Sequence, residues 1–224
     1  MTPAAINQAL LMRNNYSDPL IGNVKLLTHF DGGYADSGPY NKTPGPTAGT
    51  VITASSLYGS GAVDCTANSD CGVAYSGLEL ALSTSNFCAE CWIKDPDGTA
   101  NRFWWHIVGS TGQAVRLFIP VSSGLRCDST SAATTHNIAY SLNTWHHTAV
   151  TRNGSNWTLW LNGSSVAIWT DNTFDGGAGS CSVWLGRGSS ATTSKQSYMD
   201  EFRLTVGNAR YTASFSPVGP FPNP

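Results

Sequence analysis

The stretch WHHTAVTRNGSNWTLWLNGSSVAIWT, residues 145–170, contains three short runs of strand-forming residues separated by two tight turns. Arg152-Asn-Gly-Ser155 joins the run 146–152 to 157–162, and Asn162-Gly163 joins 157–162 to 166–170. Asn-Gly pairs are favoured in two-residue hairpin turns, where both central positions need a positive φ. Within 157–162, large apolar and other side chains alternate, as in a strand with one buried face. The stretch therefore predicts two consecutive β-hairpins.

Similar strand signals recur from about residue 23 to residue 206, with Gly, Asn and Ser between them. The remaining candidate strands are 24–30, 57–65, 71–75, 87–94, 102–109, 114–121, 136–140, 181–186 and 199–206. This spacing is typical of an antiparallel sandwich or jelly roll. We predict an all-β, two-sheet β-sandwich over residues 23–224, with a short Pro-rich tail at its C-terminal end. Residues 1–22, with a helical candidate at about 4–13, are predicted to form an N-terminal arm.

The composition excludes several classes of partner. Lys and Arg number 12 against 14 Asp and Glu, and only 12% of residues are charged. Because no basic excess is available to neutralise phosphates, nucleic-acid binding is not expected. No apolar run approaches the roughly 20 residues of a membrane helix, so membrane insertion is not expected either. The chain instead holds 26 Ser, 23 Thr and 16 Asn, which suit many turns and a solvated surface.

Several motifs, in order along the chain, resemble those of a known family. They are Leu26-Leu-Thr-His-Phe-Asp-Gly32, Asp36-Ser37, Phe87-x-x-Glu90-x-Trp92, Trp145 to Gly154, Leu161-Asn-Gly163, Leu185-Gly-Arg187, Tyr198-Met-Asp-Glu-Phe-Arg203 and Gly207 to Pro217. Together they resemble a laminin-G-like jelly-roll domain of the concanavalin A-like lectin/glucanase superfamily, in the version common in bacteriophage and marine bacterial proteins. The resemblance covers about residues 18–222. It implies the fold more than the function, since this fold hosts lectins, adhesion modules, glycosidases and virion proteins.

Two functions are compatible with the resemblance. The first is a bacteriophage virion structural protein, as a capsid decoration, head-fibre or tail-associated protein. It would be anchored to other virion proteins through residues 1–22 and display a lectin-like domain that binds host-surface glycans weakly. The second is a free-standing bacterial carbohydrate-binding or adhesion module. Residues 1–11 lack the positive charge of a secretory signal, which favours display on the virion surface after assembly in the host cytoplasm. Association into a homo-oligomer is left open.

One calcium ion is a candidate structural cofactor. Asp31 ends the first candidate strand and Asp200 begins the last, and in this fold those strands are antiparallel neighbours. Carboxylates with backbone carbonyls from nearby Gly-rich loops are ligands that Ca²⁺ takes, and the resemblance also implies a structural ion here. The alternative is an Asx turn of Asp31 with Gly32-Gly33, while Asp200 accepts backbone hydrogen bonds.

Strand alternation gathers charged and aromatic side chains on the face of the sheet opposite the core. Trp92, Trp160, His147, Glu90 and Arg203 are the candidate glycan-binding residues on this face, which Glu201 shares by alternation. Aromatic rings would pack on the C–H faces of a sugar, and the charged groups would fix its hydroxyls. The alternative is a Glu90–Arg203 salt bridge with the tryptophans filling a second small core. Trp104, Trp105, Trp169 and Trp184 cannot be assigned to a face by alternation.

Catalysis is not expected. Glycosidases need two carboxylates about 5–10 Å apart; glucanases of this superfamily carry them as Glu-x-Asp-x-Glu, and that run is missing from a sequence with three glutamates. Cys88 and Cys91 lie within one candidate strand, so their thiols should point to opposite faces as buried apolar groups. Cys65 and Cys71 flank a short loop in which a disulfide is geometrically feasible, and its formation is left open.

Overall fold

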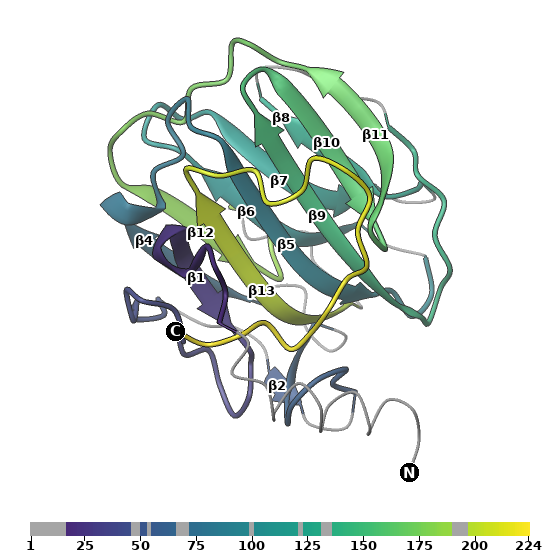
Figure 1. Cartoon of the computed structure of the whole chain (residues 1–224). Coiled ribbons are helices and arrows are strands. Elements are labelled where there is room, and N and C mark those ends of the chain that lie inside the picture. Colours follow the sequence, from purple (N-terminus) through teal and green to yellow (C-terminus); the bar gives the residue numbers. More distant parts are fainter. Residues whose placement is uncertain are drawn as a thin grey trace.

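The computed structural model describes residues 17–45, 50–52, 55–65, 72–98, 101–120, 123–130, 136–189 and 197–224. Within them, two antiparallel sheets pack face to face, with the larger sheet in front in Figure 1. The predicted all-β sandwich is therefore confirmed. The predicted helix at 4–13 and residues 1–16 of the predicted arm lie outside the described residues.

The larger sheet has the strand order β11-β10-β9-β5-β13-β3-β2, and β1 also pairs with β13. Its strands are β1 (Val24–Thr28), β2 (Thr50–Ile52), β3 (Ala62–Asp64), β5 (Phe87–Lys94), β9 (Trp145–Asn153), β10 (Asn156–Leu161), β11 (Ser164–Thr170) and β13 (Tyr198–Val206). The two predicted hairpins are β9–β10 and β10–β11. The predicted antiparallel pairing of the first and last strands is confirmed, because β1 lies against β13 from Phe202 to Thr205.

The smaller sheet has the order β4-β12-β6-β7-β8. Its strands are β4 (Val73–Gly77), β6 (Arg102–Val108), β7 (Ala114–Ile119), β8 (Arg126–Ser129) and β12 (Cys181–Leu185). Two short 3₁₀ turns, Ile21–Asn23 and Leu78–Leu80, complete the described elements. Neither of these described helical turns has the length or the apolar character needed to cross a membrane.

The core lies between the sheets and follows the predicted alternation. Phe87, Ala89, Cys91 and Ile93 of β5 point into it, as do Trp157 and Leu159 of β10. Trp104 and Trp105 are adjacent in β6, yet both are fully buried in this core. A register shift between Phe103 and Trp105 permits this, because a bulge breaks the strict alternation of faces.

Two predicted strands are wrong in extent. The run 57–65 becomes a strand only at Ala62, because the amides of Leu57 and Tyr58 bond the Asp200 carboxylate instead of a neighbouring strand. The run 136–140 forms only an isolated bridge, between Ile138 and Leu125.

The cysteines are placed largely as expected. Cys91 packs in the main core and Cys88 in a small cluster with Ala149 and Trp160, so their thiols point to opposite faces as predicted. Burial raises the pKa of the Cys91 thiol to about 12. Cys65 is disulfide-bonded, and Cys71, the second cysteine of the suggested pair, lies outside the described residues. Cys88, Cys91 and Cys181 have free, buried thiols, and Cys127 is also buried.

Candidate functional site

The chain after β13, residues 207–224, crosses the outer face of the larger sheet. We call it the C-terminal segment; it is yellow in Figure 1 and lies over β13, β5 and β9. It is held by backbone bonds at several points: the amide of Phe215 donates to the Gly163 carbonyl (3.0 Å), and that of Phe221 to Glu201 Oε2 (2.8 Å). A Cβ at position 163 would lie 1.8 Å from the Phe215 carbonyl oxygen, so only glycine admits this approach.

Beneath the C-terminal segment lies a buried charge network around Glu90. The Glu90 carboxylate accepts hydrogen bonds from Arg203 Nε (2.9 Å) and from the Tyr211 hydroxyl (2.7 Å), and His147 Nε2 lies 3.2 Å away. Asp18 accepts from both Arg203 and Arg210. Burial alone would raise the pKa of Glu90, but the Arg203 guanidinium, aided by His147 and Arg210, lowers it well below its usual range. The network is therefore ionised and internally neutralised at neutral pH.

The five residues predicted to bind glycan are brought together on this face, but most are not open to solvent. Glu90 is 0% exposed, His147 1% and Arg203 5%, because the C-terminal segment covers them. The Glu90–Arg203 salt bridge offered as the alternative is present, at 2.8 Å. Trp92 and Trp160 belong to two small apolar clusters under the same segment, with Phe221 and Phe215. Direct sugar contact by Glu90, His147 and Arg203 would therefore need the C-terminal segment to move away. In the structure these three residues instead form buried contacts between the sheet and that segment.

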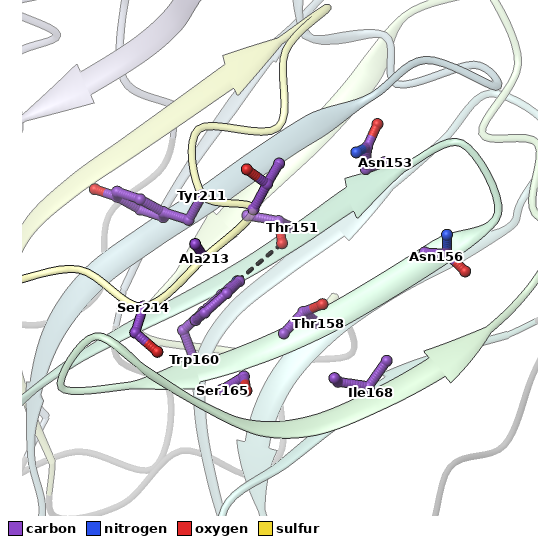
Figure 2. A pocket seen from close by; sticks show the side chains of 11 residues that line it. Thr151, Asn153, Asn156, Thr158, Trp160, Ser165, Ile168, Tyr211, Ala213 and Ser214 are labelled. Carbon is purple, nitrogen blue, oxygen red and sulfur yellow. Dashed lines mark hydrogen bonds between the residues drawn. The ribbon is translucent and has the colours of Figure 1, made fainter.

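Trp160 is the member of this set that also borders an open groove. The groove lies beside the C-terminal segment, on the outer face of β9, β10 and β11, and has a volume of about 350 Å³ (Figure 2). The strands line it with Thr151, Asn153, Asn156, Thr158, Trp160, Ser165 and Ile168, and the segment with residues 211–214. Trp160 forms part of the floor, where its Nε1 donates to Thr151 Oγ1 (2.9 Å). The ring of Tyr211 stacks on Phe215 at the segment side.

The chemistry of the groove is polar and uncharged. Its lining consists of amides, hydroxyls, two aromatic rings and the aliphatic side chain of Ile168, which is 68% exposed. None of the described residues that line it is acidic or basic. Alternation places Thr158 and Trp160 outward, but the small polar residues beside them form no sequence pattern that indicates a site. The missing signal was the C-terminal segment, whose position over β9 and β10 creates the second wall.

Asp31 and Asp200, the predicted calcium ligands, are held by one short loop, residues 57–61. Asp31 Oδ1 accepts the amides of Ser60 and Gly61, and Asp200 Oδ2 accepts those of Leu57 (2.8 Å) and Tyr58 (2.9 Å). The alternative for Asp200, backbone acceptance, is thus present, whereas Asp31 bonds this loop and not Gly32-Gly33. A Cβ at Gly59 would lie 2.1 Å from Asp31 Oδ1, so the loop needs glycine there.

The fit of this pair to a cation is partial. Asp200 Oδ1 is buried and has no hydrogen-bond partner, as an oxygen reserved for another ligand would be. Burial raises the pKa of Asp200 to about 7, since the Tyr58 amide only partly offsets the desolvation. Among the described residues no group of three or more His, Cys, Asp or Glu side chains converges on a common point. Ca²⁺ takes six to eight oxygens, so most would have to come from backbone carbonyls and water.

Trp169 and Trp184, which alternation could not assign to a face, lie in different sheets. Trp169 packs partly buried against the main core and stacks on Trp157. Trp184 pairs with His106 and Ala74, on the outer face of the smaller sheet. The guanidinium of Arg187 lies 4.9 Å from the centre of its ring. Neither tryptophan lines the groove.

Comparison with known proteins places the fold among lectin-like domains. The family model of the concanavalin A-like lectin/glucanases superfamily matches residues 67–206. No curated protein sequence matches the chain. The structure is similar to the binding domain of Paraclostridial Mosquitocidal Protein 1, with 15% identity, a TM-score of 0.61, and coverage of 86% of this chain and 50% of that one.

Two further structures extend the comparison. The sialidase of Trypanosoma rangeli has 10% identity and a TM-score of 0.62, with coverage of 82% of this chain and 30% of the sialidase. A botulinum neurotoxin type C structure, whose cell entry depends on interaction with two ganglioside molecules, has 14% identity and a TM-score of 0.57 over 83% of this chain and 48% of that one. This chain therefore spans half or less of these proteins, and at such identities the likeness shows the fold alone.

Proposed function

The chain belongs to the concanavalin A-like lectin/glucanases superfamily, and on that premise we propose that it is a carbohydrate-binding domain whose binding site is the groove beside the C-terminal segment. The observation that carries this proposal is the lining: amides and hydroxyls without any charge, next to two aromatic rings, in a space of about 350 Å³. That volume lies within the range of small-ligand sites. Fixed hydroxyls and amides would bond sugar hydroxyls, while Tyr211 and Ile168 would contact C–H groups.

The buried network beneath the C-terminal segment supports the proposal by fixing one wall of the groove. Tyr211 is anchored through its hydroxyl to Glu90, and Phe215 through its amide to Gly163. Because these anchors hold residues 211–214 against the sheet, the groove is formed before a ligand arrives, which reduces the ordering cost of binding. The dependence of botulinum neurotoxin type C on gangliosides for cell entry adds an analogy from a protein of similar fold.

Binding without catalysis is part of this proposal. Glycoside hydrolysis needs a pair of carboxylates at the scissile bond, and none of the described groove residues carries one. Glu90 and Glu201 are both buried and engaged in bonds to protein groups.

The test is a glycan array on the full chain, followed by calorimetric titration of the best neutral oligosaccharide. Replacing Asn156 and Thr158 together by alanine removes two groove hydrogen-bonding side chains and should weaken binding about tenfold, at about 0.5–1.5 kcal/mol per bond. Ser76→Ala, an exposed hydroxyl on the other sheet, serves as the matched control and should bind like the parent chain. An array without any bound glycan, or a double variant with unchanged affinity, would remove the proposal.

The biological context that we propose is display on a bacteriophage particle, with a bacterial adhesion module as the alternative. It is supported by the resemblance of the motifs, and within the predicted arm, residues 1–22, the anchor would be residues 1–16, because Asp18 is bound to Arg203 and Arg210 of the domain. Deleting residues 1–16 should leave glycan binding intact and abolish attachment to particles. Attachment that survives the deletion would contradict the anchor.

We also propose one structural Ca²⁺ held by Asp31 and Asp200, on the strength of the buried, unpartnered Asp200 Oδ1. Bound calcium would neutralise that oxygen and tie the loop 57–61 to the first and last strands. Melting temperatures in calcium and in excess chelator should differ, because an ion bound only by the folded state stabilises it. The difference should vanish in Asp200→Asn, and equal melting of the parent chain in both buffers would refute the site.

A further inference from the structure

The outer face of the smaller sheet carries a continuous row of polar and aromatic side chains. The strand registers align Trp184, His106, Arg116 and Asp128 side by side across β12, β6, β7 and β8. The adjacent row holds Phe103, Phe118 and Arg126. Whereas Arg102, Arg152 and Arg203 are buried in the molecule, the arginines of this face stay partly exposed, at 40% for Arg116 and 26% for Arg126.

Arg116 is held in a fixed orientation on this face. Its guanidinium lies 4.6 Å from the centre of the Phe118 ring and 5.7 Å from that of Phe103, and these two rings stack on one another. Stacking on a ring restrains the plane of the guanidinium while leaving its edge for planar anions. The bond to Asp128 is long, at 3.4 Å, and uses only Nη2. The Arg116 guanidinium is therefore oriented before any ligand binds, and its bond to Asp128 uses only part of its hydrogen-bonding capacity.

Beside Arg116 is a second fixed donor. The amide of Ser189 donates to His106 Nδ1 (2.9 Å), so the proton of the neutral ring resides on Nε2. Burial and the nearby Arg116 guanidinium lower the pKa of His106 to about 4, which keeps the ring neutral at physiological pH. His106 and Arg116 line the same cavity of about 420 Å³, together with Val108 and Ala114.

The cavity combines three chemical features. Two guanidinium groups, those of Arg116 and Arg126, flank the Asp128 carboxylate at 3.4 and 3.9 Å, so these three side chains together carry a net positive charge. Asp128, Thr130 and the Ser189 backbone can bond hydroxyls, and Val108 and Ala114 are apolar. An anionic group, hydroxyls and an apolar C–H face occur together in an acidic sugar residue.

We propose that this cavity is a second carbohydrate site, which binds a carboxylate-bearing sugar residue with its carboxylate on the Arg116 fork and His106 Nε2. The sugar identity rests on the proposed function of the domain, while the preference for an anion rests on this cavity alone. The two sites are on opposite outer faces of the sandwich, so one chain would hold a neutral and an acidic glycan at once.

The test uses the full chain and a galacturonate oligosaccharide, with its methyl ester as the neutral counterpart of equal shape. Arg116→Gln should weaken binding of the acid about tenfold or more, since charge-assisted bonds exceed neutral ones, and should not change binding of the ester. Arg126→Gln removes a charge from the same cluster without lining the cavity, and should weaken binding of the acid clearly less than Arg116→Gln does, because Arg126 makes no direct bond to the ligand and acts only through a screened field. The His106 side-chain resonances should shift on titration with the acid only.

Several results would overturn the site. One is equal binding of acid and ester, and another is an equal loss in the Arg116 and Arg126 variants, which would indicate a diffuse field. Preferential binding of an oligothymidylate or of anionic phospholipid vesicles through Arg116 would assign the face to another class of ligand. The groove variant lacking the Asn156 and Thr158 side chains separates the two proposals: it should keep its affinity for the acid, whereas Arg116→Gln should keep its affinity for the neutral glycan.

Discussion

The outer faces of the two sheets differ in whether their charged side chains are buried or exposed. On the larger sheet, Glu90, Arg203 and Asp18 are buried and paired beneath the C-terminal segment, and the groove left open is uncharged. On the smaller sheet, Arg116 and Arg126 lie at the surface, stacked on Phe118, and no comparable segment among the described residues covers them. Charged side chains therefore stabilise the fold on the larger sheet, whereas those on the smaller sheet remain accessible to a ligand.

The largest expected effect on stability comes from replacing Glu90, and it tests this comparison most directly. Glu90→Gln leaves Arg203 and Arg210 with a buried excess of positive charge, so the free energy of unfolding should fall by about 3–5 kcal/mol. Asp128→Asn removes a carboxylate paired on the exposed face and should cost at most about 1 kcal/mol. Urea unfolding of both variants gives the comparison, and equal losses would contradict the division of roles.

Acid should act on the same buried carboxylate. The pKa of Glu90 is lowered in the folded state, so its contribution to stability is complete above the ordinary value of 4.5 and is lost as the pH falls below it. Asp18, whose pKa is also lowered despite its burial, chiefly by its hydrogen bond to Arg210, should add to this loss. Melting temperatures between pH 7 and pH 3 should therefore decline less steeply in Glu90→Gln than in the parent chain. Parallel profiles would show that Glu90 does not titrate in this way.

A smaller effect isolates the link between the network and the groove. Tyr211→Phe removes the hydroxyl that donates to Glu90 but keeps the ring stacked on Phe215. Unfolding should become easier by about 1.5–3 kcal/mol, the value of a hydrogen bond to a charged group, and affinity for a neutral glycan should fall severalfold, because the wall of the groove is held less firmly before binding. A large loss of affinity with unchanged stability would reverse the assignment, making the hydroxyl a ligand contact.

The smallest expected change in stability is at the rim of the groove. Ile168 is 68% exposed, so Ile168→Ala should alter the free energy of unfolding by less than about 0.5 kcal/mol. It should still weaken glycan binding severalfold, because an apolar contact with the sugar ring is lost. Val218→Ala, which changes a side chain 51% exposed outside the groove, is the matched control and should affect neither property.

Local patterns predicted the strands well and the surfaces poorly. The alternation in 87–93 and 157–162 was sufficient to orient both strands, because the core imposes a period of two on them. The same reasoning placed Glu90 and Arg203 correctly on one face but could not show that residues 207–224 cover them. That segment has no periodicity, and its position depends on contacts such as that of Tyr211 with Glu90, which are 121 residues apart in the sequence.

The errors have similar causes. Leu57 and Tyr58 have the composition of a strand, yet their amides are bound by Asp200, which is more than 140 residues away. The bulge that buries both Trp104 and Trp105 depends on how β6 meets β7, which alternation cannot express. The arginine–phenylalanine stack of the smaller sheet needed the register of three strands, β6, β7 and β8. In each case the residues could be identified in the sequence, but the residues that they contact in the fold could not.

The network around Glu90 also has a consequence for synthesis. Glu90 precedes Arg203 by 113 residues and Tyr211 by 121, and Asp18 precedes Arg210 by 192. A chain emerging from the ribosome therefore exposes these carboxylates long before their arginine and tyrosine partners exist. Since burying them unpaired is costly, the first half of the domain cannot close early, and such long-range pairing is typical of slow folding. The sandwich would therefore complete its folding only after β13 and the C-terminal segment have been synthesised.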